Sequence, residues 1–207
     1  GEAACVSVHG ANRLGSNSFL DLVVFGKSAA NRCGQILNPK RKNKKVKKEY
    51  YSHLIERFSD IKKRRGTKSV SKIRLEMQHT MQNFCPVYRS EKKMKKGRDI
   101  LVNLLKQTKN LKITDSSLIW NTELIEALEL QNLLLQSIAS IETALERKES
   151  RGAHARDDFK ERNDKKWLKH LLTYVDDKGS TKIKSRVVSL KTKSKEIKTI
   201  EPKARVY

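Results

Sequence analysis

The stretch TELIEALELQNLLLQSIASIETALER, residues 122–147, decides how the central part of this chain folds. Its apolar side chains recur every three or four residues, which places them on one face of an α-helix. That stripe consists of Leu124, Leu128, Leu134, Ile138, Ile141 and Leu145. Acidic and amide residues interrupt the run, which is therefore too polar for the roughly 20 apolar residues of a membrane span. The segment predicts an amphipathic helix that packs against other helices.

Two further helices are predicted upstream of this one. Residues 69–84 place Ile73, Met77 and Met81 on one face, as expected for core packing, and residues 91–108 follow after a short connection. Helices joined by short connections pack as antiparallel neighbours. We therefore predict a three-helix bundle within a helical domain of residues 69–157.

The pattern changes after Phe159. Residues 167–175 and 181–190 alternate between apolar and polar side chains, and the turn sequence Asp176-Asp177-Lys178-Gly179 separates them. Such alternation around a turn predicts a β-hairpin. The fold class is therefore mainly α with a small β element, and residues 158–207 form a β-hairpin and tail.

Near the amino terminus, small residues, an arginine and a predicted helix start come together. Asn17 stands before an apolar run as a candidate N-cap, so we expect a helix over residues 18–35. The unpaired N–H groups of a helix start favour anionic oxygen atoms. Arg13 directly precedes that start and carries a planar fork of donors that suits a carboxylate. The alternative for Arg13 is a solvated arginine near the helix cap.

A second helical segment follows the break at Asn38-Pro39. Its apolar residues recur at helical spacing up to Gly66, and they are Tyr51, Leu54, Ile55, Phe58 and Ile61. We expect this segment to close a first domain over residues 1–68. The apolar side chains of residues 18–35 cannot form a core alone, so a layer that lies elsewhere must cover them.

The charge of the chain favours a different class of function. Lys and Arg number 46 against 23 Asp and Glu, a net +23, which is typical of nucleic-acid-binding proteins. Residues 39–68 hold 13 basic and 3 acidic residues of this total. Neither basic cluster there contains interleaved aromatic residues for base stacking. A solvated basic face, an acidic partner and an anionic membrane surface all stay open as explanations.

Several motifs resemble the flavoprotein subunit of succinate dehydrogenase, and more loosely the flavoproteins of fumarate reductase and L-aspartate oxidase. They are, in the order of that family, GEAACVSVHGANRLGSNSFLDLVVFG at residues 1–26, MQHTMQ at 77–82, SLIWNTELIEALEL at 117–130, RKESRGAHARDDF at 147–159 and PKARVY at 202–207. The resemblance covers nearly the whole chain. It implies that residues 1–68 are the last part of a Rossmann-like FAD-binding domain.

The same resemblance implies roles for individual residues. Glu2 corresponds to the acid that binds the ribityl hydroxyls of FAD, and Ser18 and Phe19 to the pair whose backbone N–H groups meet the pyrimidine end of the flavin. Arg13 corresponds to the arginine that binds a substrate carboxylate. His9 is expected to pack or to bond to the backbone, His154 and Arg156 to bond across a domain seam, and Trp120 and Trp167 to be core or interface anchors. No metal ligands are expected.

The family's glycine-rich dinucleotide turn, flavin-carrying histidine and proton-transferring arginine have no counterpart here. We therefore expect the C-terminal third of a split flavoprotein, inactive alone and without a catalytic residue of its own. The implied partners are an N-terminal fragment with covalently bound FAD, an iron–sulfur subunit, succinate or fumarate and, indirectly, membrane anchor subunits, but no nucleic acid. The expected place is the matrix side of the mitochondrial inner membrane or the cytoplasmic face of a bacterial one.

Two alternative functions remain at this stage. One is a part of a soluble fumarate reductase or L-aspartate oxidase, and the other is a non-catalytic basic protein that binds nucleic acid or has a structural role. The cysteines Cys5, Cys33 and Cys85 are widely spaced and odd in number, which favours reduced thiols.

Overall fold

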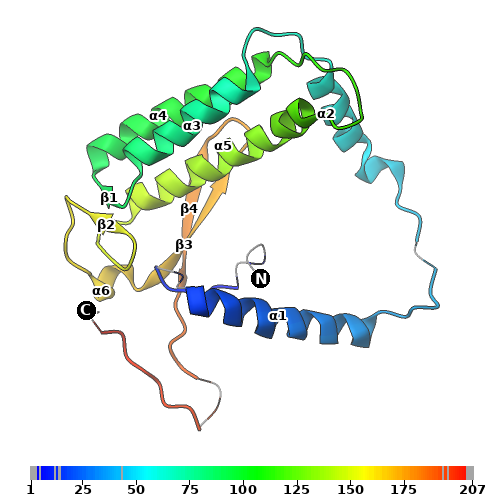
Figure 1. Ribbon diagram of the computed structural model, residues 1–207. Coiled ribbons are helices and arrows are strands. Elements are labelled where there is room, and N and C mark those ends of the chain that lie inside the picture. The colour runs from blue at the N-terminus through cyan, green and yellow to red at the C-terminus, as the bar shows by residue number, and fades with distance from the viewer. Residues whose placement is uncertain are drawn as a thin grey trace.

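The computed structural model describes residues 4, 6–11, 13, 15–42, 44–192, 194 and 196–203. Its helices are α1 (Gly15–Ile36), α2 (Ser52–Lys62), α3 (Val70–Phe84), α4 (Glu91–Gln107), α5 (Thr122–Glu146) and α6 (Asp164–Trp167), with short 3₁₀ turns η2 (Lys48–Tyr50) and η3 (Thr108–Asn110). Its strands are β1 (Tyr88–Arg89), β2 (Ala155–Arg156), β3 (Lys169–Val175) and β4 (Thr181–Val187). The expectation of a mainly helical chain with small sheets is confirmed (Figure 1).

Helices α3, α4 and α5 pack side by side and enclose the core (Figure 1). The fully buried core residues include Met94, Leu101, Leu104, Leu130, Leu134, Ile138 and Ile141. Helix α4 approaches its neighbours closely at Gly97, where an added Cβ would lie 2.5 Å from Phe84 Cβ. The buried face of α5 passes through Ala127 and Leu130, whereas Leu128 of the predicted stripe is only partly buried.

Helix α1 differs from its prediction in two ways. It begins at Gly15, three residues earlier than expected, so Asn17 lies inside the helix and the predicted N-cap is wrong. In the described part of the chain its one buried residue is Asp21, while Phe19, Leu20 and Val24 are more than half exposed. Figure 1 shows α1 well apart from the bundle, connected to it by residues 37–51.

Helix α2 and the residues after it are attached to the bundle. Ile61 is 1% exposed and belongs to the same core as α3, α4 and α5. Beyond the helix, the Gly66 N–H donates to the Leu111 carbonyl at 2.9 Å, and the Lys112 N–H donates to the Lys68 carbonyl at 2.8 Å. The end of the predicted first domain therefore packs on the second, and the boundary at residue 68 stays a prediction.

Strands β3 and β4 pair antiparallel, with Leu172 opposite Lys184, and lie against α5. The turn between them is closed by Asp176, whose Oδ1 accepts from the N–H groups of Lys178 (2.9 Å) and Ser180 (2.8 Å). Gly179 has a φ of +84°, a conformation that glycine adopts without a steric cost. Next to this turn, Val175 at the end of β3 packs against the core of the helical bundle.

The short helix α6 and the short strands β1 and β2 were not expected. Residues 164–167 form α6, where a strand start was predicted at Trp167, because the Asn163 side chain accepts from the Lys166 N–H at 3.0 Å and caps a helical turn. Strands β1 and β2 pair in parallel over two residues, which is too short for any periodic pattern.

Among the described residues, no helix is long and apolar enough to cross a membrane.

Candidate functional site

The loop of residues 6–11 is tied to α1 by a hydrogen bond between side chains. His9 Nε2 lies 3.2 Å from Asp21 Oδ2, and Asp21 is only 6% exposed. The hydrogen bond from His9 holds the pKa of Asp21 below its ordinary value. His9 was expected to pack or to bond to the backbone, but it bonds to a carboxylate twelve residues later. The pair fixes the loop relative to the first turns of the helix.

The predicted ligand residues lie at this end of α1. Arg13 is exposed and stands two residues before the helix, Ser18 is partly buried, and Phe19 is 68% exposed. In a helix that begins at Gly15, the N–H groups without an intrahelical partner belong to the residues before Ser18. This helix start speaks against the backbone contacts assigned to Ser18 and Phe19, and that assignment stays a prediction. Glu2 lies outside the described residues.

A cavity of about 890 Å³ separates this loop from the hairpin. Its lining comes from residues 6–11, 167–171 and 186–190, together with Arg147, Arg151 and Thr143. Arg186 Nη2 donates to Ser7 Oγ across one side of it. Burial, followed by the charge of Arg186, lowers the pKa of His170. The titratable side chains in the lining are all basic, so the cavity favours anions over cations.

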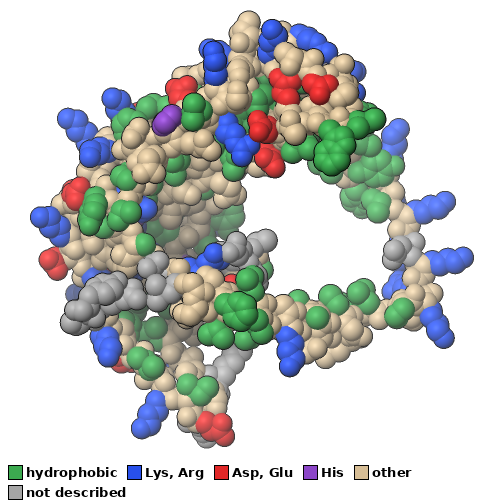
Figure 2. Space-filling model, viewed as in Figure 1, with side chains coloured by type: hydrophobic (Ala, Val, Ile, Leu, Met, Phe, Trp, Pro, Cys, Tyr) green, Lys and Arg blue, Asp and Glu red, His purple; other side chains and the backbone are tan. Residues whose placement is uncertain are grey.

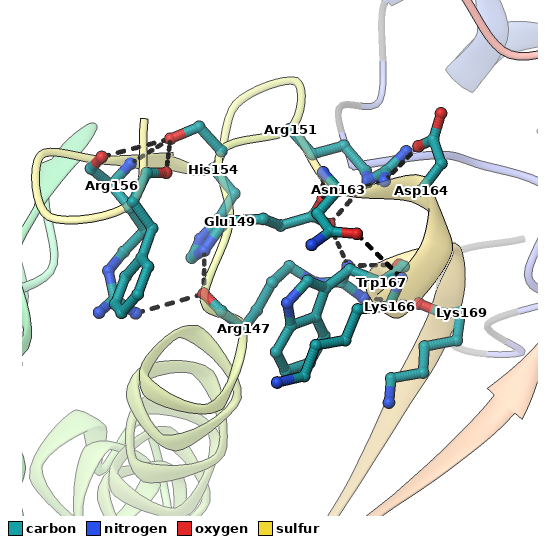
Figure 3. Close-up of polar contacts among 12 residues, drawn as sticks. Arg147, Glu149, Arg151, His154, Arg156, Asn163, Asp164, Lys166, Trp167 and Lys169 are labelled. Atoms are coloured by element: carbon teal, nitrogen blue, oxygen red, sulfur yellow. Dashed lines mark hydrogen bonds and ion pairs between the residues drawn. The ribbon is translucent and has the colours of Figure 1, made fainter. Parts of the chain in front are cut away.

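A buried polar cluster follows the end of α5 (Figure 3). Glu149 is 0% exposed, and its carboxylate accepts from Arg147 Nη1 (2.6 Å), from Arg151 Nε (2.8 Å) and from the Asn163 N–H (2.9 Å). Burial acts to raise the pKa of Glu149, but the hydrogen bonds from Arg151, Asn163 and Arg147 outweigh it and lower that pKa. Two paired arginines thus compensate one buried carboxylate.

Arg156 closes the carboxyl end of α5. Its guanidinium, 0% exposed, donates through Nη1 to the carbonyls of Ala144 (2.9 Å) and Leu145 (3.2 Å). The other edge of the fork binds both oxygens of Asp158, at 2.7 and 2.9 Å. The hydrogen bond from Arg156 lowers the pKa of Asp158 to about 2. Arg156 therefore has a structural role, because its guanidinium donates hydrogen bonds to carbonyls at the end of α5 that have no partner within the helix.

His154 is a second structural residue of this region. Arg89 Nη1 lies 2.9 Å from its Nδ1, and its Nε2 lies 3.0 Å from the Arg147 carbonyl. Since a guanidinium only donates, Nδ1 accepts and Nε2 carries the proton. Burial, with the nearby arginine charges, lowers the pKa of His154. The neutral ring bridges β1 and the end of α5.

Sequence reasoning missed Asp21 and Glu149. A single acid within the apolar run of α1 was the available signal for Asp21, and arginines two residues to either side were the signal for Glu149.

In the part of the chain that is described, no three His, Cys, Asp or Glu side chains gather as a metal site. Trp167 is buried with Lys169 Nζ 4.8 Å from the ring centre, whereas Trp120 is 92% exposed.

Comparisons with known proteins agree on one family. The model of the fumarate reductase flavoprotein C-terminal region matches residues 74–207. The chain is 48% identical over all 207 residues to the succinate dehydrogenase flavoprotein subunit of Rickettsia bellii, and covers 35% of that protein. It is 44% identical over 207 residues to the mitochondrial succinate dehydrogenase [ubiquinone] flavoprotein subunit of Oryza sativa subsp. japonica, and covers 33% of it.

A solved structure supports the same conclusion. The E. coli quinol fumarate reductase matches with a TM-score of 0.81 and 36% identity, over 98% of this chain and 34% of that one. The chain thus spans about a third of the length of the relatives it matches. It belongs to the succinate dehydrogenase and fumarate reductase flavoprotein family and corresponds to the C-terminal part of the flavoprotein subunit.

Proposed function

We propose that this chain completes the FAD and dicarboxylate site of a succinate dehydrogenase flavoprotein, which oxidises succinate to fumarate and passes electrons through FAD to an iron–sulfur subunit and a quinone. The observation that carries the proposal is the position of Arg13, directly before α1 in a loop that His9 and Asp21 tie to the helix. The identities of 44–48% with the succinate dehydrogenase subunits of Rickettsia species and Oryza sativa support this enzyme.

The residues around Arg13 leave room for a ligand that carries anionic oxygen atoms. Among the described atoms, nothing lies within 4 Å of an added Cβ at Gly10 or Gly15. That space is open to a ligand or to the rest of a flavin domain, and the helix start beside it favours anionic oxygen atoms. When bound, FAD would accept a hydride from the substrate.

Arg13 would hold one succinate carboxylate through two parallel hydrogen bonds and so orient the reacting C–H bond. Glu2, Ser18 and Phe19 would contact the cofactor, as the family resemblance implies. The proton-transferring arginine would come from the other part of the flavoprotein, so this chain has a binding and orienting role.

Helix α1 would belong to a Rossmann-like layer of the FAD domain, with residues 1–68 in that domain, 69–157 in a helical domain and 158–207 in the tail. The exposed side chains of Phe19, Leu20 and Val24 support a covering layer outside the described residues. In the split arrangement, a separate N-terminal chain supplies that layer and carries FAD covalently. Denaturing electrophoresis of the purified enzyme tests this, because flavin fluorescence and this sequence would occupy different bands.

The assembled enzyme would lie on the matrix side of the mitochondrial inner membrane or on the cytoplasmic face of a bacterial membrane. Relatives of both kinds support this place, since mitochondrial and bacterial flavoprotein subunits both match the chain. Contact with membrane anchor subunits would be indirect, through the iron–sulfur subunit.

Replacement of Arg13 tests the proposed function. In the assembled enzyme we expect Arg13→Ala to raise KM for succinate and to lower kcat, with a combined loss of about 10³-fold in kcat/KM. Arg13→Lys should recover only part of this loss, because an ammonium lacks the planar fork. Flavin content should not change. Arg32→Ala, at an exposed arginine within α1, is the matched control. Near-normal efficiency of the Arg13→Ala enzyme would refute the assignment.

A further inference from the structure

The loop before α5, residues 114–121, exposes three consecutive apolar side chains. Leu118, Ile119 and Trp120 are 68%, 78% and 92% exposed. Figure 2 shows hydrophobic side chains gathered at the end of the molecule where Figure 1 places α2 and the start of α5. Contiguous exposed apolar surface of this kind marks an interaction site.

Hydrogen bonds fix the shape of this loop in advance. The Asn121 side chain donates to the carbonyls of Asp115 (2.9 Å) and Ser117 (3.0 Å) and accepts from the Leu124 N–H (2.8 Å). Glu123 Oε2 accepts from the N–H groups of Thr114 (2.8 Å) and Asp115 (3.0 Å). Because the loop is already ordered, a partner that binds it avoids most of the entropy cost of fixing it.

The backbone at Trp120 has an unfavourable conformation. Its φ is +54°, in the left-handed region that bulky L-residues seldom adopt. Such strain persists only where the surroundings impose it, here the bonds of Asn121. Tryptophan is also the residue type most enriched among interface residues that dominate binding. A strained and rigid loop that presents an indole to solvent therefore indicates an interface anchor.

The occupant of this surface can be identified from the rest of the chain. The loop starts beside the end of α2, where the Ile113 N–H donates to the Arg64 carbonyl at 3.1 Å. Helix α2 itself exposes Leu54 and Ile55, by 53% and 56%, and leads back to the uncovered α1. Exposed apolar side chains thus occur on α1, on α2 and in this loop, while the segment of residues 40–48 between the two helices is basic. About two thirds of the flavoprotein length of the relatives lies outside this chain.

We propose that Leu118, Ile119 and Trp120 form a preformed anchor onto which the flavin-binding remainder of the flavoprotein docks. The inference rests on the proposed function, since it takes that remainder as the partner. The three side chains bear no charge, as is usual for the core of an obligate interface. Docking at this loop, together with the layer that covers α1, would fix the orientation of the helical bundle relative to the flavin domain.

A photo-crosslinking experiment on the assembled enzyme tests the inference. A benzophenone amino acid replaces Ile119, and the crosslinked peptides are mapped by mass spectrometry after irradiation. We expect crosslinks to peptides of the flavin-binding part. Tyr88, 69% exposed at the opposite end of the bundle, is the control position. Crosslinks only to the iron–sulfur subunit or to a second copy, equal yields at both positions, or no crosslink would overturn the inference.

A pair of Trp120 variants supplies a second measurement. We expect Trp120→Ala to speed the dissociation of the flavin-binding part from the helical bundle by at least tenfold, and Trp120→Phe by less than about threefold. Hydroxyl-radical oxidation of the unmodified enzyme should be slow at Trp120. Rapid oxidation there in an active, flavin-loaded enzyme would overturn this inference alone. An unmodified enzyme that lacks flavin and succinate oxidation would overturn the proposed function as well.

Discussion

His9 ties the loop before α1 to that helix, and Arg186 bonds to the same loop at Ser7. The bond between His9 and Asp21 is buried on the carboxylate side, so water competes poorly for it. We expect His9→Ala to lower kcat/KM about 10- to 100-fold with unchanged flavin content, because Arg13 would lose its position. The effect should appear in both KM and kcat.

The controls for this experiment separate positioning from general damage. Asp21→Asn keeps an acceptor for His9 and should act more weakly than Asp21→Ala. His53→Ala changes an exposed histidine on α2 and should be neutral. Equal kinetics of the His9→Ala and unmodified enzymes at equal flavin content would show that the loop does not need this bond.

Asp158 predicts a stability change with pH. Its pKa is about 2 in the folded protein against an ordinary 3.8, so the unfolded chain takes up its proton first as the pH falls. The contribution of Asp158 is therefore complete above about pH 4 and is lost between about pH 4 and pH 2. At pH 7, Asp158→Asn should cost about 2 kcal/mol, a partial value because Asp158 is partly solvated whereas Arg156 is buried.

Thermal unfolding between pH 7 and pH 2.5 measures this difference. The gap in Tm between the unmodified protein and Asp158→Asn should narrow as the pH falls. Asp157→Asn, at the exposed neighbouring position, should show no such gap. A gap that is constant over the whole range would mean that the carboxylate charge of Asp158 does not contribute.

Sequence alone reached some of these residues and not others. Arg13 could be singled out as a candidate because its residue type, its small neighbours and the predicted helix start all suit one ligand, and its role stays a prediction. The bond from His9 to Asp21 could not be predicted, because no local pattern pairs residues twelve positions apart across a loop. Trp120 was expected in a core or at an interface, and only its exposure of 92% separates the two. The positions of Arg13, Ser18 and Phe19 relative to FAD stay predictions.

At the scale of elements, Gly97 sets the spacing of the bundle. An added Cβ would lie 2.5 Å from Phe84 Cβ and 3.0 Å from Ile141 Cδ1. Alanine favours helix by about 1 kcal/mol over glycine, but overpacking costs about 1–3 kcal/mol. Since the closest contact is to a Cβ that cannot rotate away, we expect Gly97→Ala to lower the free energy of unfolding by about 1–2 kcal/mol.

Denaturant unfolding gives this value, and Asn103→Ala is the control on the same helix. Asn103 is exposed, so its replacement brings the helix propensity of alanine without crowding. It should be neutral or slightly stabilising. If Gly97→Ala were as stable as Asn103→Ala, the close approach of α4 to α3 and α5 would not be a constraint.

The helices of the bundle could be located from sequence because each carries many core residues in one period. Helices α3, α4 and α5 end within one residue of their predicted bounds. The start of α1 was missed by three residues. Its apolar side chains pack on no core among the described residues, so their spacing does not mark where the helix begins. The turn of α6 depends on a single cap by Asn163, and β1 pairs with β2 only through tertiary contact.

For the whole molecule, the net charge of +23 predicts binding to any polyanion at low salt. Residues 40–42 and 44–48 are exposed and largely without helix, so their lysines can spread over many phosphates. We expect RNA binding to be independent of sequence and weaker than micromolar at about 0.2 M salt. Replacing the basic residues of 40–48 by Gln should weaken this RNA binding without loss of succinate oxidation. Submicromolar binding at that salt would instead support a nucleic-acid function.

The bare apolar surface of α1 and of the loop at Trp120 also bears on the fate of copies that fail to find their complement. If the flavoprotein is split as proposed, chaperones and proteases would recognise such surface on copies without a partner and remove them within a short lifetime. Cellular abundance would then be set by whichever of the two complementary parts is scarcer, and pulse–chase labelling after depletion of the other part would reveal faster turnover. Removal of unpaired copies would keep the two parts of the flavoprotein at equal amounts.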